Sequence, residues 1–476
     1  MSSFSKKISY SDIVFLFLCI SLFIVFLMPF EHYTSLNLVN ISSGSNKKYL
    51  NDLTSANIGL FKNRYYIFYY TLCISSLAIL FNKNIFLDIL CYFKGFGRIT
   101  KSAIYLFFIF GIISSCFAFS PSVAIKGVGL TFLQFINVLF VARYIQEKQF
   151  GVEILYKVVL LSLIFFGGSL ALQLWLSNYS IYGSYIAGNI QKALLYLYNC
   201  LNPRFLDNYF SWFLPLLLLP WFIDMRPIYK IGSFIAITMV WFVLINHAFR
   251  TIYAEYLIIL PLLFIYSRKY FRITIAVFVL AFSLGYLIDY AFTNYVLSSG
   301  TSQISTLVRY GTSGRLSLWH EAFMIGLAHP LTGIGQWNYL VYTKYSAGYP
   351  HNLLLEIWSQ WSIPAFVGAA TVILISVKNL FKQRLEICSN PLHCIFIMML
   401  VAGMIDGMLN AMFKTSLGLF GCVFVFGFCL SIIKSKTSIL ESSKANSVCI
   451  YLTSFLIIGS IFCIIVVPYI FPPMWI

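Results

Sequence analysis

Three residues with chemically active side chains lie at the end of a long apolar run or in the polar stretch between two such runs. Arg250 follows the apolar run 231–249, Arg315 opens the stretch RLSLWHEA, and His351 follows Pro350 in PHNLLLE. An arginine offers a planar fork of N–H donors that matches phosphate oxygens. A histidine can take up a proton near neutral pH. Together these residue types predict an anion-binding site with a general base beside it.

Each of these residues also has a structural interpretation. Arg250 fits equally well as an arginine that extends from a span end to water, with Glu255 as its partner or as a second polar group of the site. Arg315 fits an exposed surface arginine, and His351 an ordinary interfacial histidine. We favour anion binding for Arg315, because the turn at Gly314 places it at the start of a short helix, where free N–H groups attract anions.

Two further residues complete the predicted site. Arg204 lies in a predicted outer segment and is expected to bind substrate. Asn352 directly follows His351 and is expected to bind substrate or to orient the imidazole ring. We interpret His320 as a structural residue within the amphipathic helix, and His329 as a capping or loop-packing residue beside the helix-ending sequence HPLTGIG.

A metal or cofactor is not expected at this site. Magnesium and manganese prefer carboxylate oxygens, and the sequence shows neither DxD nor HExxH near the predicted site. The predicted outer segments carry few carboxylates: Glu31, Asp52, Asp207, Glu321 and Glu356. The eleven cysteines form no CxxC pair. We therefore predict activity without metal and infer no disulfide framework.

The composition identifies the class of protein that must position these residues. Of the 476 residues, 60% are hydrophobic and only 10% are charged, and the mean hydropathy is +0.85. A transmembrane barrel would show short alternating segments instead of long apolar runs. The sequence predicts an all-α polytopic membrane protein with about 12–14 transmembrane helices, since a span needs roughly 20 apolar residues.

The predicted spans alternate with polar loops. In chain order they are residues 12–30, 65–82, 102–119, 124–142, 158–176, 209–223, 231–249, 252–267, 273–293, 357–377, 393–413, 416–433 and 448–470. The net charge of +17 does not indicate nucleic acid, because most Lys and Arg residues fall in loops that are inside if the N-terminus is inside. The division predicted is an N-terminal transmembrane bundle (1–293), a catalytic loop (294–356) that faces outward, and C-terminal transmembrane helices (357–476).

Taken in order, these motifs resemble those of the bacterial O-antigen ligase and polymerase family, which is shared with pilin-type O-oligosaccharyltransferases. The matching features are Arg250 at the outer end of a span, GRLSLWHEA, HPLTGIG and PHNLLLE. The resemblance implies a multi-pass protein of the inner membrane with its active site facing the periplasm. It also implies transfer of a glycan from undecaprenyl diphosphate to an acceptor hydroxyl, as in membrane-embedded glycosyltransferases.

The resemblance also implies roles for the residues. Arg250 and Arg315 would bind the diphosphate and stabilise charge on the leaving group, and His351 would take the acceptor proton. Direct displacement would invert the anomeric carbon. The acceptor distinguishes lipid A–core ligases in lipopolysaccharide biosynthesis, polymerases that extend lipid-linked repeat units, and protein oligosaccharyltransferases. We favour a ligase, because the loop contains no added domain.

A transporter or flippase for lipid-linked sugars is the alternative of a different class. Such proteins line a pathway through the membrane with charged residues, whereas charge in this sequence gathers outside the predicted spans. A continuous polar lining through the helix bundle would favour transport. A structural membrane protein without catalytic function would not explain Arg250, Arg315 and His351 together.

Overall fold

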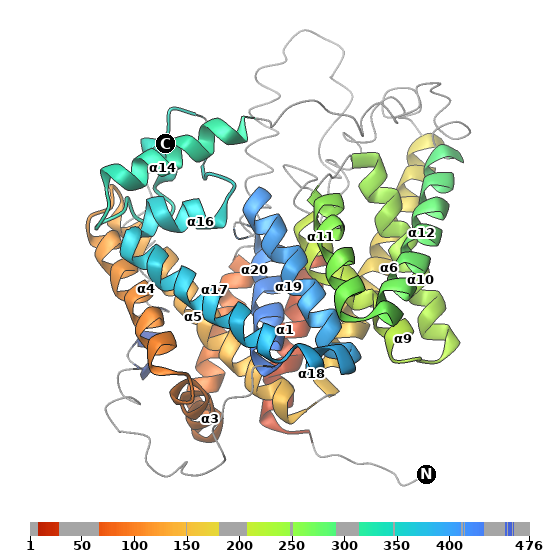
Figure 1. The fold of residues 1–476 in the computed structure, drawn as a ribbon, viewed down its shortest axis with the longest axis horizontal. Helices are drawn as coiled ribbons and strands as arrows, with labels where there is room; N and C mark the ends of the chain where they lie inside the picture. Colours follow the sequence, from red (N-terminus) through yellow and green to blue (C-terminus); the bar gives the residue numbers. More distant parts are fainter. Residues whose placement is uncertain are drawn as a thin grey trace.

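The computed structural model describes residues 8–27, 66–148, 150–179, 207–247, 251–291, 314–345, 348–410, 413, 415–432, 453, 454, 456–458 and 460. Its regular elements in these ranges are helices (Figure 1). The first half contains α1 (Tyr10–Leu27), a helix at Tyr66–Phe81, α3 (Lys83–Lys94), α4 (Arg98–Cys116), α5 (Pro121–Glu147), α6 (Phe150–Tyr179), α8 (Asp207–Phe213), η4 (Leu214–Leu218), α9 (Leu219–Phe222) and α10 (Pro227–His247). The second half contains α11 (Thr251–Tyr266), α12 (Arg268–Ala291), α14 (Arg315–Ala328), α15 (Tyr339–Tyr342), α16 (Leu353–Glu356), the π-helix η6 (Ile357–Trp361), α17 (Ile363–Lys382), α18 (Arg384–Ser389), α19 (Pro391–Leu409) and α20 (Ser416–Ile432).

The all-α polytopic membrane fold predicted from the sequence is confirmed. Within the described residues, six helices are long and apolar enough to cross a membrane, or seven if a bent pair forms one span. Three shorter apolar helices accompany them, at Tyr10–Phe26, Thr251–Tyr266 and Ser416–Ile432. The total of about 12–14 spans remains a prediction, because parts of the chain that would contribute to it lie outside the described residues.

Two predicted spans are broken by prolines. The run 209–223 forms α8, the 3-10 helix η4 and α9, with Pro215 and Pro220 at the starts of the second and third pieces. The run 357–377 begins as η6 and continues as α17, with Pro364 in the first turn of α17. Hydropathy did not predict these breaks, because it counts apolar side chains and not the backbone N–H that proline lacks.

Small residues allow the central helices to approach closely. The indole of Trp212 on α8 is fully buried, and its N–H donates to the carbonyl of Gly418 at 2.9 Å. A Cβ added at Gly403 on α19 or Gly421 on α20 would collide with the Trp212 ring. Glycines at helix contacts are a common device of membrane proteins. Here they seat a large aromatic side chain between three helices.

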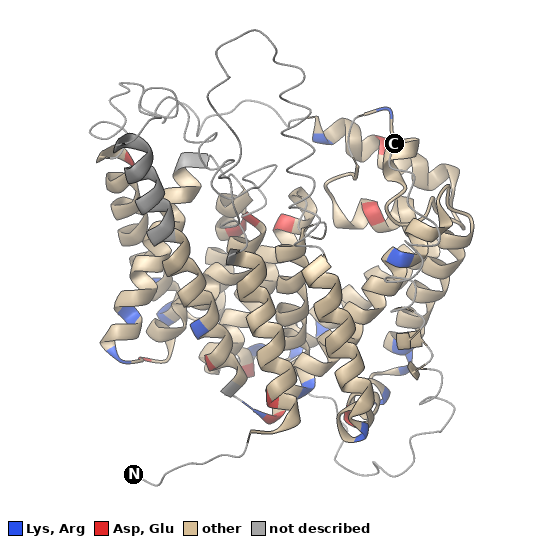
Figure 2. Cartoon of the chain, turned by 180° about the vertical axis from the view of Figure 1, so that it is seen from behind, with Lys and Arg blue, Asp and Glu red and all other residues tan. Residues whose placement is uncertain are grey.

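The two ends of the bundle differ in charge. Figure 1 shows α14 and α16 at one end, here called the α14 end, and the N-terminus at the opposite end. Basic residues gather at the opposite end, as Figure 2 shows. In the sequence, lysines and arginines belong to α3 and the first turn of α4, the junction of α5 with α6, the starts of α10 and α12, and the junction of α17 with α18. Such an excess is typical of the cytoplasmic side of a membrane protein.

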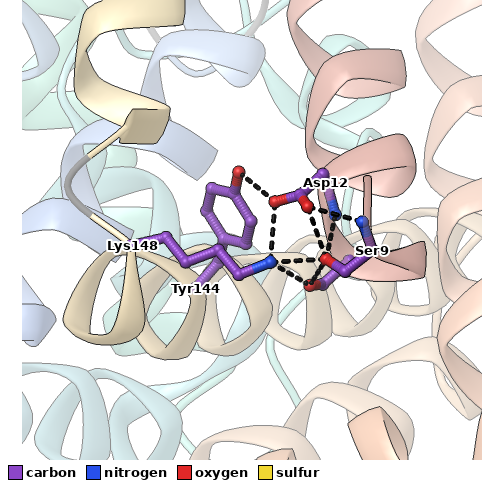
Figure 3. A network of polar contacts seen from close by, with 5 residues as sticks. Ser9, Asp12, Tyr144 and Lys148 are labelled. Atoms are coloured by element: carbon purple, nitrogen blue, oxygen red, sulfur yellow. Dashed lines mark hydrogen bonds and ion pairs between the residues drawn. The ribbon is translucent and has the colours of Figure 1, made fainter. Parts of the chain in front are cut away.

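One ionic network at that opposite end ties α1 to α5 (Figure 3). The ammonium of Lys148 lies 2.8 Å from Asp12 Oδ1, and the Tyr144 hydroxyl donates to the same oxygen at 3.0 Å. The other carboxylate oxygen of Asp12 accepts from the N–H and hydroxyl of Ser9, at 2.7 and 2.6 Å. Because every member of the network is held by another, it fixes the start of α1 rather than offering a binding site.

Candidate functional site

The HPLTGIG sequence is fastened to the break between η6 and α17. Pro364 has no N–H, so the carbonyl of Gln360 cannot receive the helical hydrogen bond that residue 364 would otherwise donate. The N–H of Gly335 donates to that carbonyl at 2.9 Å, and the hydroxyl of Ser114 on α4 donates to it at 2.5 Å. The N–H of Ile334 satisfies the neighbouring carbonyl of Ser359 at 3.1 Å. The motif therefore supplies the donors that the broken span lacks.

Two more hydrogen bonds complete this attachment. The N–H of Trp337 donates to Gln360 Oε1 at 2.7 Å. In the other direction, the N–H of Ile363 donates to the carbonyl of Pro330 at 2.9 Å. Backbone groups without partners are costly at membrane depth, so the loop and the broken span stabilise each other. This arrangement fixes α16, which directly precedes η6.

Replacing Gly335 with alanine is expected to destabilise this attachment. Gly335 has φ +82°, which is strained for other residues, and an added Cβ would collide with the side chain of Ala118. We expect a cost of about 1–3 kcal/mol and a lower midpoint of thermal unfolding in detergent. Gly348→Ala is the matched control, because Gly348 lies in the same segment with open space around it. Equal midpoints for the two variants would contradict this role of the motif.

His351 occupies a sharply defined turn. Its φ of +55° lies in the left-handed region, which histidine tolerates better than most residues. Pro350 before it is buried. Asn352 after it caps α16, since its Oδ1 accepts from the N–H of Leu355 at 3.0 Å, while its Nδ2 donates to the carbonyl of Met408 on α19 at 3.2 Å. The backbone of His351 is therefore fixed between α16 and the end of α19.

Tyr349 links His351 to Arg315. The rings of Tyr349 and His351 have centroids 4.4 Å apart and are tilted by 55°. Burial raises the pKa of Tyr349 to about 12; the nearby carboxylate of Glu356 acts in the same direction, and the guanidinium of Arg315 opposes them. The phenol is therefore neutral at physiological pH. Arg315 and Glu356 thus act electrostatically on Tyr349, whose ring contacts His351.

A buried polar cluster borders this region. Its members come from the starts of α8 and α11, the end of α19 and the residue before α20: Asp207, Asn208, Ser211, Glu255, Asp406, Asn410 and Thr415. The guanidinium of Arg315 interacts electrostatically with Asp406. Asp406 lies two residues before Met408, whose carbonyl accepts from Asn352. The polar cluster thus approaches the His351 turn from the bundle side.

Hydrogen bonds join the polar cluster into one network. Asn208 donates to Asp406 Oδ2 at 2.5 Å and accepts from the Thr415 hydroxyl at 2.9 Å. The hydroxyl of Ser211 donates to Glu255 Oε1 at 2.6 Å. The second oxygens of Glu255 and Asp406 have no hydrogen-bond partner among the described residues. Because an unpaired polar atom is costly when buried, these two oxygens give the network capacity for further donors.

Two of the predicted site residues lie outside the described residues. These are Arg250, which immediately precedes α11, and Arg204, which lies three residues before the first residue of α8. The first described residues of α11 and α8, Thr251 and Asp207, are both buried at the α14 end. The site assigned to Arg250 and Arg204 remains a prediction. Arg315, His351 and Asn352 are all described, and the structure brings them to the same end of the bundle.

The amphipathic helix predicted after Gly314 is present as α14. Leu318, Ala322 and Ile325 are buried, whereas Leu316 and Phe323 are exposed. Apolar residues lie on several faces of α14, so the spacing of apolar residues in the sequence could not predict which face is buried. The inward face packs beside Tyr339, whose hydroxyl donates to the carbonyl of Leu318 at 3.1 Å.

Of the two histidines interpreted as structural, His329 has the predicted capping position. His329 follows the last residue of α14 as its C-cap, and its ring meets Tyr342 edge-on with centroids 5.6 Å apart. His320 lies within α14 and is exposed. In the part of the chain that the structure describes, no group of three or more His, Cys, Asp or Glu side chains is arranged to hold a metal ion.

Sequence reasoning missed Asn208, Ser114 and Gln360. Each is a neutral polar residue within or directly beside an apolar run, and each is buried or hydrogen-bonded to a distant element. A polar side chain at membrane depth is itself a usable signal, because it must find a partner there. The identity of the partner was not available from the sequence, since it depends on which helices are neighbours.

Fold and site together define a polytopic membrane protein with a polar, arginine- and histidine-bearing site at one end of its helix bundle. The family model described as O-antigen ligase matches residues 232–370, from α10 into α17. The O-antigen ligase family predicted from the motifs is thereby confirmed for this segment, which contains α14, the HPLTGIG loop and His351. No curated protein was found to match the sequence.

Proposed function

We propose that the protein transfers a glycan from undecaprenyl diphosphate to an acceptor hydroxyl at the periplasmic face of the bacterial inner membrane. The observation that carries the proposal is that Tyr349 contacts His351 and is influenced electrostatically by Arg315, within the segment that the O-antigen ligase family model matches. A lipid diphosphate is anionic and amphipathic. Its headgroup therefore suits a cationic site at the end of a helix bundle.

The reaction requires one base and one cationic group. The imidazole of His351 takes the proton of the acceptor hydroxyl, while the acceptor oxygen forms a bond to the anomeric carbon. The bond between that carbon and the diphosphate oxygen breaks, and the polyprenyl diphosphate leaves with the electron pair. Arg315, together with Arg250, stabilises the charge on the leaving group. A single displacement inverts the anomeric configuration.

The positions of buried charged residues support an enzyme over a transporter. The buried carboxylates among the described residues are Asp207, Glu255, Asp289 and Asp406. All four lie near the helix termini at the α14 end, and no buried lysine or arginine occurs in the described core. A conduit for a charged headgroup would need polar lining along its length. The position of these buried carboxylates at the α14 end favours chemistry at a membrane surface over transport through the bundle.

The distribution of lysines and arginines supports a periplasmic orientation for the site. Lysines and arginines gather at the end opposite α14 (Figure 2), and such residues mark the cytoplasmic side. We infer that the α14 end faces the periplasm. We also propose the division into 1–293, 294–356 and 357–476, with the middle segment as the catalytic loop, because that segment lies between apolar runs and contains Arg315 and His351.

Reconstitution tests the activity and the acceptor together. The purified chain in proteoliposomes is given an undecaprenyl-diphosphate-linked glycan and, in separate reactions, lipid A–core, a second lipid-linked repeat unit or pilin. We expect transfer to lipid A–core, as a ligase requires. Transfer to the repeat unit or to pilin would instead identify a polymerase or a protein oligosaccharyltransferase. Movement of intact donor across the bilayer without transfer would contradict the proposal in favour of a flippase.

Removal of divalent metal is expected to leave the transfer rate unchanged. The proposed mechanism places Arg315 and Arg250 where other glycosyltransferases use a metal ion to neutralise the diphosphate. The measurement compares initial rates before and after EDTA treatment, with added magnesium or manganese as the reciprocal arm. Loss of transfer on EDTA treatment that either metal restores would refute metal-independent catalysis.

A further inference from the structure

The backbone at His351 is fixed, but its imidazole needs a separate constraint. Pro350 restricts the chain before it, and the Asn352 cap holds the chain after it, through Leu355 and Met408. None of these contacts limits rotation about the side-chain bonds of His351. A general base must hold its nitrogen within hydrogen-bond reach of the proton that it removes.

Tyr349 makes a contact that can limit rotation of the His351 imidazole. Its ring and the imidazole have centroids 4.4 Å apart, at the close end of the range for aromatic pairs. At this separation and a tilt of 55° the two rings are in contact, so the ring of Tyr349 limits the space into which the imidazole can turn. Tyr349 is itself half-buried, and Pro350 between the two residues is buried. Because of this burial, the phenol ring of Tyr349 is itself held in place beside the imidazole.

We propose that Tyr349 is a positioning residue, whose ring holds the His351 imidazole in the orientation needed to accept the acceptor proton. The kinetic part of this inference rests on the proposed glycan transfer; the orientation of the ring does not. The ring, rather than the hydroxyl, performs this role, because the contact with His351 is between the two rings. Tyr349→Phe keeps the support, and Tyr349→Leu removes it.

The kinetic test separates positioning from substrate binding. We expect Tyr349→Leu to lower kcat by on the order of 10- to 100-fold, because small misplacements of a catalytic group have effects of that size. The KM for the lipid-linked donor should stay near the wild-type value. Tyr349→Phe should retain wild-type kcat. In the His351→Ala background Tyr349→Leu should have no further effect, since neighbouring residues that act together are not additive.

Tyr342→Leu is the matched control. It removes the other aromatic partner of a histidine in this segment, at 5.6 Å from the ring of His329. We expect it to leave kcat unchanged. A raised donor KM in Tyr349→Leu would instead indicate that Tyr349 stacks on the donor. An equal loss in the His351→Ala background would indicate a structural role. Either result would overturn the proposal.

A chemical measurement tests the orientation without any assay of transfer. Diethyl pyrocarbonate acylates accessible imidazole nitrogens, and mass spectrometry of the purified protein reports the modification rate of each histidine. We expect His351 to react faster in Tyr349→Leu than in wild type or Tyr349→Phe, and Tyr342→Leu to accelerate His329 only. An unchanged rate at His351 would refute the support. If wild type transfers no glycan but this rate pattern holds, only the proposed function fails.

Discussion

Replacing His351 with asparagine is expected to lower the rate of glycan transfer by about 10²–10⁴-fold, the usual contribution of a general base. Asparagine tolerates the left-handed conformation that His351 adopts at φ +55°, so the turn should survive the substitution. It cannot take up a proton near neutral pH. Donor affinity should stay near wild type, because the proton moves only as the acceptor attacks.

Three comparisons make this result specific to the imidazole. His351→Gln also removes the base, and near-normal transfer in that variant would eliminate the assignment. His351→Ala should lose as much transfer as the asparagine variant and some stability, because alanine tolerates the left-handed region less well. His320→Ala is the matched control, since His320 is an exposed histidine on α14. It should transfer at the wild-type rate. All variants are compared at equal amounts in the membrane.

The sequence predicted local features of the candidate site well. Gly314 and the RLSLWHEA pattern placed the start of a helix at Arg315, where α14 begins, and HPLTGIG placed its end before His329. These features are set by nearby residues: a glycine turn, an apolar pattern and a helix-breaking proline. The apolar runs predicted the membrane helices for the same reason, since a span depends mainly on its own composition.

Features that depend on distant partners could not be predicted. The polar cluster joins Asn208, Glu255 and Asp406 from three helices, and nothing in a linear pattern states that these helices meet. The break before α17 depends on the carbonyl of Gln360 finding the N–H of Gly335. Hydropathy counts residues along one segment, so it extended the span through residue 357 instead of starting α17 at Ile363.

The contact of Tyr349 with His351 could not be predicted from the sequence either. Tyr349 is one aromatic residue among the 18% of the chain that are Phe, Trp or Tyr, so its type alone carries no information. Its contact with His351 depends on the turn that Pro350 and the left-handed His351 create. A residue that acts through its neighbour's side chain becomes visible only when both side chains have been placed.

Replacing Arg315 with alanine is expected to weaken donor binding as well as turnover. A diphosphate contact exists before the transition state and strengthens within it. Hydrogen bonds to charged groups contribute about 1.5–3 kcal/mol, so donor affinity should fall by on the order of 10–100-fold. Arg315→Lys should restore only part of the loss, because an ammonium cannot form the two parallel hydrogen bonds of a guanidinium.

Thermal stability separates this role from a structural one. Arg315 is the first residue of α14, and a cation at a helix N-terminus is unfavourable because the helix dipole is positive there. Arg315→Ala should therefore unfold at the wild-type temperature or above it, while its donor affinity falls. The exposed Lys344 in the same segment is the matched control, and Lys344→Ala should change neither quantity. If Arg315 served only as a counter-charge to Asp406, the alanine variant would unfold at a lower temperature and bind the donor normally. That pair of results would remove Arg315 from the donor site.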